Sequence, residues 1–578
     1  MFKLLKYLKK YTIPALLGPF FKITEAAFEL IVPLIMTDII DHAIPTGEVN
    51  EVLKKGIILV ALSVTGYICS IICQYFASAS SQGIGTEIRN ALFKHIQSLS
   101  YKEIDTLGTP SLMTRMTNDI TNVQQAVAMT IRLASRAPFI IIGATIMVIR
   151  INFQLALIFI VAAIFIALFI YWILSITLPS FKKGQKMLEK LALVTRENLE
   201  GARVIRAFSK EDYEIKRFNQ RTQKHREITL YTGKFNALLN PITILIVNIA
   251  IILIIYQGGV KINTGRMSQG EIIAFISYMT QILQAIIAFS NTLVIINRGN
   301  ASAKRINEIF ETQNSLIEGT KTDLKSSQEG SKVSLKNVCF SYDANKDHFI
   351  SNINVEIEPN ETIGIIGVTG SGKSTLVNLI SRFYDVNEGE ILIDDQNVKS
   401  YTFETLRKKI AIVPQNASLF YGTLRQNMQW QKEDATDQEI YEALEIAQAL
   451  PFVQEFKEGL DTLIYQGGKN LSGGQRQRLT IARALVSKPS ILILDDSASA
   501  LDFATDASLR KAIYTHLKHT TVFLVSQRVN TIKNADKIIV LDEGKMMGVG
   551  SHQELLKHCD IYEQICRSQL SSKELDYE

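Results

Sequence analysis

The chain has 578 residues and a formal net charge of +6. This length is too great for one hydrophobic core and excludes a single small domain, so at least two domains are expected. The hydrophobic content of 47% is an average over two unlike parts, because long uncharged apolar runs fill about the first half. The five cysteines show no C-x-x-C spacing and therefore indicate neither a disulfide framework nor a zinc site.

The first half begins with a basic segment followed by long apolar stretches. Residues 1–10 alternate apolar and basic side chains at helical spacing and lack a small-residue cleavage site, which predicts an interfacial amphipathic helix rather than a signal peptide. Crossing a hydrocarbon core takes a helix of ~20 residues. Six stretches are long enough and are predicted to span a membrane: residues 13–36, 56–78, 128–149, 155–177, 235–256 and 272–296.

The distribution of basic residues predicts the orientation of these spans. The loop at residues 41–53 contains no Lys or Arg, whereas the connection at residues 178–234 contains fourteen. Cytoplasmic loops carry the excess of Lys and Arg, so this connection and the amino terminus are expected in the cytoplasm. Six spans then return the second half of the chain to the cytoplasm. We expect a multi-pass protein of the cell membrane.

The two long cytoplasmic connections, residues 82–127 and 178–234, are rich in helix-forming residues and contain few breakers. They predict helices that continue beyond the membrane, each with one irregular elbow, at residues 101–111 and 200–210. We expect these elbows to contact the soluble domain. Residues 312–330 are rich in Ser, Thr, Lys and Glu and predict a linker.

The first predicted span carries charges that are costly inside a membrane. Lys22, Glu25 and Glu29 lie at i, i+3 and i+7, on one face of a helix. Two interpretations remain open: an acidic patch that attracts cationic compounds, or a structural ion pair between Lys22 and Glu25. Arg132 and Arg136 flank the third span and are expected to extend to the interface.

A phosphate-binding motif opens the second half of the chain. The sequence Gly367-Val-Thr-Gly-Ser-Gly-Lys-Ser-Thr375 fits G-x-x-x-x-G-K-[ST] and follows an apolar strand-like run. Glycines let backbone N–H groups surround phosphates, Lys373 reaches the β- and γ-phosphates, and the Ser374 hydroxyl ligates Mg²⁺. The predicted nucleotide-binding residues here are Gly367, Thr369, Gly370, Ser371, Gly372, Lys373, Ser374 and Thr375. ATP and Mg²⁺ are the expected cofactors.

Strand-like runs alternate with helical stretches from residue 331 onward, which predicts an α/β domain. The runs are residues 362–366, 389–394, 410–413, 490–494, 521–525 and 537–541. A second motif, Leu471-Ser-Gly-Gly-Gln475, is followed by a helical stretch and by a strand ending in Asp495-Asp496.

With this second motif the chain resembles the ATP-binding cassette family, to which Leu-Ser-Gly-Gly-Gln at this distance after a P-loop is highly specific. Six spans ahead of one cassette resemble an exporter half-transporter over essentially the whole chain. The expected fold is an all-α polytopic membrane domain of six transmembrane helices with long cytoplasmic extensions, followed by an α/β P-loop ATP-binding cassette domain. The expected boundaries are 1–311 for the transmembrane domain, 312–330 for the linker and 331–578 for the nucleotide-binding domain.

The resemblance implies roles for several further residues. Tyr342 matches the aromatic residue that stacks on adenine, and Gln415 matches the glutamine that meets Mg²⁺ and the attacking water. Asp495 matches the Mg²⁺-binding carboxylate, so the implied metal ligands are Ser374, Gln415 and Asp495. The loop at residues 499–502 matches the one that touches the opposing cassette. The signature residues Ser472, Gly473, Gly474 and Gln475 would meet a nucleotide held by a second cassette.

Two positions depart from the family pattern. Asp496 stands where the family has a catalytic glutamate, and Gln527 stands where it has a switch histidine. The Asp side chain is one methylene shorter and reaches water poorly, since a general base must lie within ~3 Å of its proton. Glutamine bonds a phosphate but carries no proton near neutral pH. The implied catalytic residues are Asp496, Gln527 and Gln415, at an impaired site; drift in a dispensable enzyme is the alternative.

The same two substitutions are typical of one half of heterodimeric bacterial multidrug exporters. The resemblance therefore implies an ATPase-coupled exporter half that moves drugs or other amphipathic small molecules. Its expected partners are a second half-transporter with the catalytic Glu and His, membrane lipids, and hydrophobic or cationic substrates, with no nucleic acid. The alternatives are a lipid or peptide exporter half, or a nucleotide-gated regulatory or sensor subunit that transports nothing itself.

Overall fold

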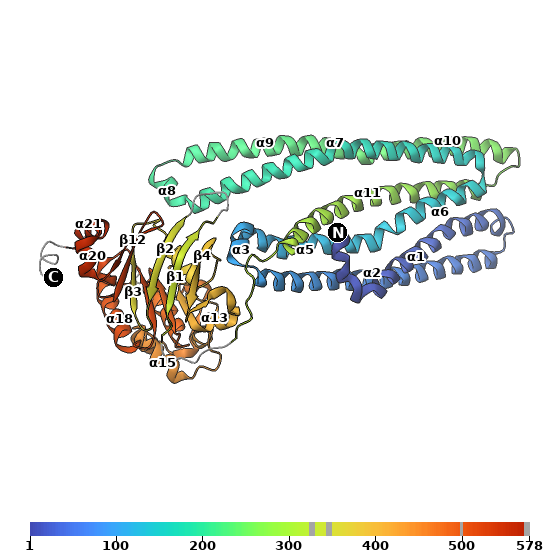
Figure 1. Cartoon of the computed structure of the whole chain (residues 1–578). Coiled ribbons are helices and arrows are strands. Elements are labelled where there is room, and N and C mark those ends of the chain that lie inside the picture. Colours follow the sequence, from blue (N-terminus) through green and yellow to red (C-terminus); the bar gives the residue numbers. More distant parts are fainter. Residues whose placement is uncertain (323–329, 343–348, 498–500, 571–578) are drawn as a thin grey trace. The chain divides into compact units, whose positions relative to one another are not determined.

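The computed structural model describes residues 1–322, 330–342, 349–497 and 501–570, which form two compact units (Figure 1). The first unit comprises Met1–Gln97 and Gly108–Thr312, and the second comprises Ser98–Leu107 and Gln313–Glu578. A short segment from within the helical part of the chain, Ser98–Leu107, thus belongs to the carboxyl-terminal unit.

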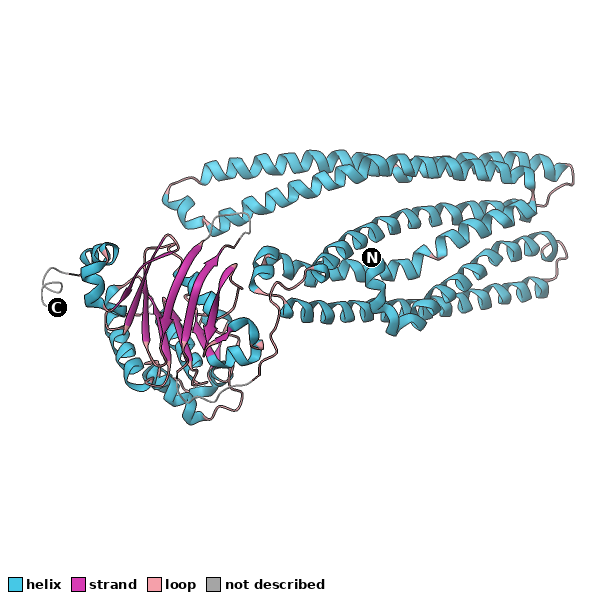
Figure 2. Ribbon diagram, in the orientation of Figure 1, coloured by secondary structure: helices cyan, strands magenta, loops and turns pink. Residues whose placement is uncertain are grey.

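Helices make up the first unit (Figure 2). They are the 3₁₀ helix η1 (Phe2–Tyr11), α1 (Thr12–Asp38), the π-helical η2 (Ile39–Ala43), α2 (Val49–Ser98), α4 (Thr109–Thr114), the π-helical η3 (Arg115–Asp119), α5 (Ile120–Met129), the π-helical η4 (Thr130–Ala134), α6 (Arg136–Ile151), α7 (Phe153–Glu200), α8 (Ala202–Ala207), α9 (Glu211–Ala237), α10 (Leu239–Asn263) and α11 (Gln269–Glu311).

The predicted spans all lie within these helices. In the described part of the chain, five helical stretches are long and apolar enough to cross a membrane: Val49–Ser98, Thr109–Ile151, Phe153–Glu200, Glu211–Asn263 and Gln269–Glu311. Helix α1 holds the remaining predicted span and differs because Lys22, Glu25 and Glu29 interrupt its apolar sequence. The polytopic helical fold is confirmed, with one span more charged than the others.

The ends of the long helices are fixed by local capping. Asn152 begins α7, where its side-chain oxygen accepts from the backbone N–H groups of Gln154 and Leu155. Ser268 begins α11 with a reciprocal capping box to Glu271. Both expected elbows interrupt their connections as short helices, the first as α3 (Tyr101–Leu107) and α4, the second as α8.

A buried carboxylate joins α11 to the segment after the first elbow. The Asp119 side chain is only 3% exposed. Its oxygens accept from the Ser302 hydroxyl at 2.8 Å and from the Arg305 Nε at 2.8 Å. A buried charge is costly unless it is paired and hydrogen-bonded, so this network fixes the register of the two helices.

The second unit combines sheets with short helices (Figure 2). Its strands are β1 (Val333–Phe340), β2 (Ile350–Ile357), β3 (Thr362–Ile366), β4 (Glu388–Ile393), β5 (Gln396–Asn397), β6 (Ile410–Val413), β7 (Gly422–Thr423), β8 (Leu463–Ile464), β9 (Ile491–Asp495), β10 (Thr521–Val525), β11 (Lys537–Asp542) and β12 (Lys545–Gly550). The predicted strands correspond to β3, β4, β6, β9, β10 and β11, within one residue at each end.

The helices of the second unit follow the strands closely. They are α3, α12 (Lys373–Ile380), η5 (Val398–Ser400), α13 (Phe403–Lys409), α14 (Leu424–Met428), α15 (Asp437–Ile446), α16 (Leu450–Gln454), η6 (Gly459–Asp461), η7 (Gln466–Gly468), α17 (Gly473–Leu485), α18 (Phe503–His516), α19 (Val529–Ile532), α20 (His552–His558) and α21 (Asp560–Gln569).

Two larger sheets form the body of this unit among its described residues. One has the order β2-β1-β4-β5 and is antiparallel. The other has the order β12-β11-β3-β10-β9-β6 and is parallel except for β12. Strands β3, β9 and β10 are fully buried, as expected of parallel strands covered on both faces. The predicted α/β domain is confirmed.

Candidate functional site

Four parallel strands bring the chemically important loops to one edge of the sheet. The glycine motif follows β3, Gln415 follows β6, Asp495 ends β9 and Gln527 follows β10. Ligands of parallel sheets bind outside the carboxyl ends of the strands. A pocket of about 200 Å³ lies there, and its lining includes Gln415, Asp495, Asp496 and Gln527.

The glycine motif borders this pocket with backbone that carries few side chains. A Cβ on Gly367 would lie 2.1 Å from the Leu541 carbonyl oxygen, so the strand can turn there only without a side chain. Gly372 has φ +98°, a conformation that favours glycine, and it precedes α12. The motif residues Thr369, Gly370, Gly372, Lys373, Ser374 and Thr375 all line the pocket. The helix start and its free N–H groups suit an anion.

Lys373 lies folded into its own loop. Its ammonium group donates to the carbonyl oxygens of Gly367 and Val368, both at 2.8 Å. Burial lowers the pKa of Lys373 below its ordinary value, while the charges of Asp496 and Asp495 act in the opposite direction. A phosphate in the pocket would supply a further negative partner for this buried ammonium. The donor set fits a nucleotide.

Ser374 and Asp495 form a pair at the floor of the pocket. The Ser374 hydroxyl donates to Asp495 Oδ1 at 3.1 Å. Burial raises the pKa of Asp495, and the bond from Ser374 partly opposes this rise. The described residues contain no group of three His, Cys, Asp or Glu side chains arranged for a metal. Mg²⁺ needs none, because one carboxylate, a hydroxyl and phosphate oxygens suffice, and the residues here fit that requirement.

Asp496 points into the same pocket in an unusual backbone conformation. Its φ is +47°, and its N–H donates to the Val525 carbonyl at 2.9 Å, which ties it to β10. Its Oδ2 accepts from Gln415 Nε2 at 3.3 Å. Burial raises the pKa of Asp496, and the bond from Gln415 partly opposes this rise. The two side chains thus meet although 81 residues separate them.

The other predicted residues lie close to this centre or at a separate surface. The Tyr342 hydroxyl is 3.0 Å from that of Thr375, and the residue is 45% exposed. Ser472 is the N-cap residue of α17 and forms a capping box with Gln475. Gly473 and Gly474 form the first turn of that helix, and none of these four signature residues lines the pocket. Of the loop at residues 499–502, positions 499 and 500 lie outside the described residues.

Comparison with known proteins identifies the family. The family model described as ABC transporter transmembrane region matches residues 15–286, and the one described as ABC transporter matches residues 350–499. An uncharacterized ABC transporter ATP-binding protein, YfiB of Bacillus subtilis, is 36% identical over 98% of both chains. The chain belongs to the ABC transporter family. It is an exporter half-transporter, with the membrane domain fused to one cassette.

Other relatives agree on this architecture. An ATP-dependent lipid A-core flippase of Desulfotalea psychrophila is 32% identical over 95% of both chains. The structure of a bacterial Atm1-family ABC exporter with ATP bound has a TM-score of 0.81 and covers 98% of this chain and 99% of its own, at 22% identity. This structural likeness concerns the fold.

The first elbow of the transporter packs against the cassette. The rings of Tyr101 in α3 and Phe383 lie 4.6 Å apart, between centroids. The Tyr384 hydroxyl donates to Asp105 Oδ2 at 2.7 Å. Burial raises the pKa of Tyr384, and the bond to Asp105 raises it further. For this elbow, the expected contact with the soluble domain is confirmed.

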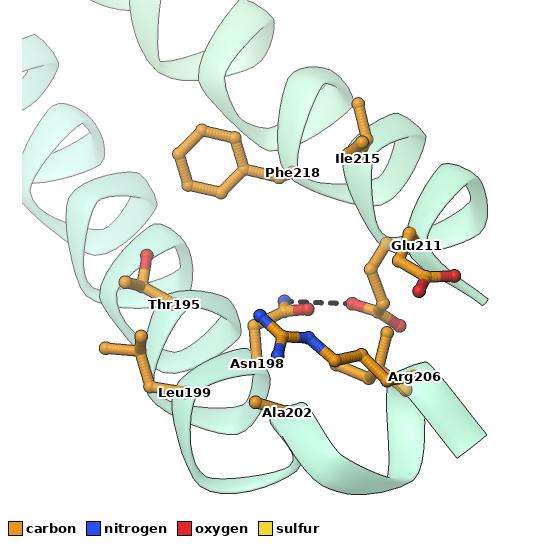
Figure 3. Close-up of a pocket in the computed structure, with 10 residues that line it drawn as sticks. Thr195, Asn198, Leu199, Ala202, Arg206, Glu211, Ile215 and Phe218 are labelled. Atoms are coloured by element: carbon orange, nitrogen blue, oxygen red, sulfur yellow. Dashed lines mark hydrogen bonds between the residues drawn. The ribbon is translucent and has the colours of Figure 1, made fainter. Parts of the chain in front are cut away.

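The second elbow encloses an apolar pocket of about 420 Å³ between the end of α7, α8 and the start of α9. Figure 3 shows Leu199, Ile215 and Phe218 around this pocket. An Asn198 bond to Glu214 of 3.0 Å ties α7 to α9 beside it. The elbow is a preformed apolar surface on the helical unit.

Ion pairs neutralise both carboxylates of the first span. Lys22 Nζ lies 2.7 Å from Glu25 Oε2, which supports the structural ion pair. Arg136 lies 2.6 Å from Glu29 Oε2, so this side chain forms an ion pair that the sequence did not predict. The sequence could not show this pair because the partners lie 107 residues apart. Arg132, in the π-helical η4, donates to the Ser78 hydroxyl at 3.3 Å.

Sequence reasoning missed two kinds of site residue. Phe349 and Val525 line the nucleotide pocket, but an apolar residue beside a strand end carries no motif. Gln569, in the last helix of the described chain, bonds the backbone of the loop that carries Gln527. Nothing in the sequence near Gln569 signals this role, because the two segments meet only in the folded cassette.

Proposed function

We propose that this chain is the degenerate-site half of a heterodimeric exporter that moves drugs or other amphipathic small molecules across the cytoplasmic membrane. One observation carries the proposal: the pocket that holds an intact phosphate cradle is lined, at its water-handling positions, by Asp496 and Gln527. The Asp496 carboxylate accepts a hydrogen bond from the Gln415 side-chain amide. Such a site binds ATP and hydrolyses it slowly.

The proposed binding roles combine the geometry of the pocket with the roles that the family resemblance implies. The backbone from Gly367 to Thr375, with Lys373, holds the phosphates, and the exposed ring of Tyr342 stacks on adenine. Ser374, Gln415 and Asp495 would hold Mg²⁺, which would supply charge neutralisation at the phosphates. Ser472 and Gly474, at the start of α17, face the nucleotide of the second cassette. The proposed domains are residues 1–311, 312–330 and 331–578.

The catalytic limitation follows from the side chains themselves. A general base must come within hydrogen-bond reach of the water it activates, and the Asp496 carboxylate is one methylene short of that of the family's glutamate. Gln527 can donate to a γ-phosphate but cannot hold an additional proton. A homodimer would contain this weak site twice. A partner with Glu and His at these positions would form a competent site with the intact signature of this chain.

Purified chains test this proposal by their ATPase activity. The chain alone is expected to be nearly inactive, and addition of the partner half-transporter is expected to restore turnover. Replacement of the partner's catalytic glutamate by glutamine should remove most of this activity, whereas Asp496→Asn should remove little. ATP should persist at this chain's own P-loop through several turnovers. Rapid hydrolysis by the chain alone would contradict the proposal.

Export of an anionic lipid is a second candidate for the transported substrate. Lys22, Arg132 and Arg136 outnumber Glu25 and Glu29, and both carboxylates are already paired. The Nε atoms of Arg132 and Arg136 are buried without a hydrogen-bond partner in the described structure. A relative named as a lipid A-core flippase supports this candidate. Vesicles that contain fluorescent anionic lipids or cationic dyes would separate the two substrate classes.

The same vesicles test a regulatory role without transport. The partner is kept intact and Arg132 of this chain is replaced by Gln. Reduced ATP-dependent movement of either substrate supports an exporter half whose cavity includes this chain. Unchanged movement of both substrates supports a nucleotide-gated regulatory subunit instead.

A further inference from the structure

The loop that carries Gln527 is held at its backbone by a residue from the end of the cassette. Gln569 is the last residue of α21. Its Nε2 donates to the Gln527 carbonyl at 2.8 Å, and its Oε1 accepts from the Val529 N–H at 2.9 Å. One amide thus joins two backbone groups that flank Arg528.

This arrangement fixes the orientation of the Gln569 amide. The Gln527 carbonyl needs a donor and the Val529 N–H needs an acceptor, so only one of the two amide orientations satisfies both. Val529 is the first residue of α19, and the side chain of its N-cap residue, Arg528, makes no capping bond. Gln569 therefore supplies from outside the acceptor that a helix N-terminus ordinarily takes from a capping side chain.

Further hydrogen bonds hold the backbone of the loop that carries Gln527. The Ser526 N–H donates to the Ile365 carbonyl of β3 at 3.1 Å, and the Arg528 N–H donates to the Ser526 hydroxyl at 3.0 Å. The loop is therefore tied to the strand that leads into the phosphate motif on one side and to α21 on the other. Within this frame the Gln527 side chain lines the nucleotide pocket.

The helix that carries Gln569 is itself firmly seated. Tyr562 and Cys566 of α21 are fully buried, and the next residue after the helix, Leu570, is 8% exposed. They belong to one core that also contains Val529 and Ile532 of α19. A His552 nitrogen lies 2.6 Å from the Tyr562 hydroxyl and links α20 to α21. The side-chain amide of Gln569 is thus held by a helix that is itself fixed in the core of the cassette.

We propose that Gln569 is a positioning residue of the nucleotide site, which holds the backbone of the switch loop so that the Gln527 amide faces the γ-phosphate. The inference rests on the proposed function, because it takes Gln527 as the group that distinguishes ATP from ADP. It adds that α21, remote from the phosphate motif in sequence, controls this discrimination. Small misplacements of a site residue cost much of its effect.

A comparison of ATP and ADP affinity tests this inference on the full-length chain in lipid nanodiscs with Mg²⁺. Binding is measured with fluorescent analogues of the two nucleotides. Gln569→Met keeps the length of the side chain but removes both hydrogen bonds. The matched control is Gln564→Met, at an exposed glutamine of the same helix. We expect Gln569→Met to lower the ratio of ATP to ADP affinity about fivefold, the loss typical of one ordinary hydrogen bond, here the bond from the Gln527 amide to the γ-phosphate. Gln564→Met should leave the ratio unchanged.

A double-mutant cycle shows whether the effect passes through Gln527. In a Gln527→Ala background, Gln569→Met should cause no further fall in the ratio. Gln569→Glu, which keeps an acceptor for the Val529 N–H but loses the donor to Gln527, should give an intermediate ratio. Hydrogen exchange of the Val529 amide should quicken in Gln569→Met and stay slow in Gln569→Glu.

Distinct results overturn the inference and the proposed function. An unchanged ratio in Gln569→Met, or an equal fall in the Gln527→Ala background, would overturn the positioning role while leaving nucleotide binding intact. An equal loss of affinity for both nucleotides would assign Gln569 to the stability of the cassette and would also overturn it. Failure of the unmodified chain to bind either nucleotide would overturn the proposed function and, with it, the inference.

Discussion

Restoring ATP hydrolysis at this chain's own nucleotide site is the most direct test of the roles assigned to Asp496 and Gln527. The double variant Asp496→Glu with Gln527→His introduces the two groups that the family uses to handle water. The added methylene moves the carboxylate outward by about 1.5 Å, the length of one C–C bond. A base within ~3 Å of its proton accelerates a reaction by about 10²–10⁴, or ~2.7–5.4 kcal/mol of the barrier.

Two features of the pocket reduce the expected gain. Asp496 has φ +47°, a conformation that Asp tolerates better than Glu at a cost of about 1 kcal/mol. Gln415 donates to the Asp496 carboxylate and would compete for the new one with a net bond of about 1 kcal/mol. Together these costs of about 2 kcal/mol leave about 0.7–3.4 kcal/mol of the barrier reduction, a gain of about threefold to three-hundredfold in ATP turnover.

Steady-state ATP hydrolysis by the purified full-length chain, without a partner, measures this gain. Lys373→Ala added to the double variant provides the background, because it removes the phosphate contact while leaving Asp496→Glu and Gln527→His in place. The reasoning is refuted if the unmodified chain already hydrolyses ATP rapidly and Asp496→Asn abolishes that activity. Asp496 would then be a working base, and the chain would need no competent partner.

Three further predictions follow from the site and its surroundings. Burial raises the pKa of Asp495, whereas bound Mg²⁺ favours its ionised form. Mg²⁺-dependent nucleotide affinity should therefore be constant above this raised pKa. It should fall as pH drops through that pKa, by at most about tenfold per pH unit. Fluorescent-nucleotide titrations should find this slope lost in Asp495→Asn. Glu25→Gln with Glu29→Gln removes the carboxylate partners of Lys22 and Arg136, so vesicle assays should find equal loss of transport for cationic and neutral compounds and a lower Tm. Selective loss for cations would contradict the structural ion pair. Tyr384→Phe removes the 2.7 Å hydrogen bond to Asp105, so the amount of substrate transported per ATP hydrolysed should fall while nucleotide affinity stays unchanged. Asp105→Asn keeps an acceptor for the Tyr384 hydroxyl and is the milder control.

Local patterns in the sequence were sufficient to predict the helices, strands and nucleotide-binding motifs of this protein. The apolar lengths of the spans, the strand-like runs before Gly367 and Asp495, and the helical stretch after Gln475 each depend on residues close together in the chain. A helix or a phosphate loop depends mainly on such neighbouring residues. The sequence therefore sufficed to predict the helical membrane domain, the α/β cassette and the motifs that mark its nucleotide site.

The sequence predicted less well where charge and position depend on distant partners. The sequence predicted Arg136 at the membrane interface but gave no sign of its ion pair with Glu29 of another helix. Helix α1 was predicted as a span with three costly charges, and in the described residues it is not among the stretches long and apolar enough to cross a membrane by composition. Charges within a span are stabilised by whatever group packs opposite them, and that group is chosen by helix packing.

The sequence by itself determined which residue types are present: an intact phosphate motif, an intact signature, and the two departures at Asp496 and Gln527. Only the tertiary structure decided that Gln415 bonds Asp496 and that Gln569 holds the Gln527 loop. The physical reason is that parallel strands far apart in the chain place their carboxyl ends at one edge of the sheet, and that α21 packs into the same core as α19. Residues that no local pattern connects become neighbours there.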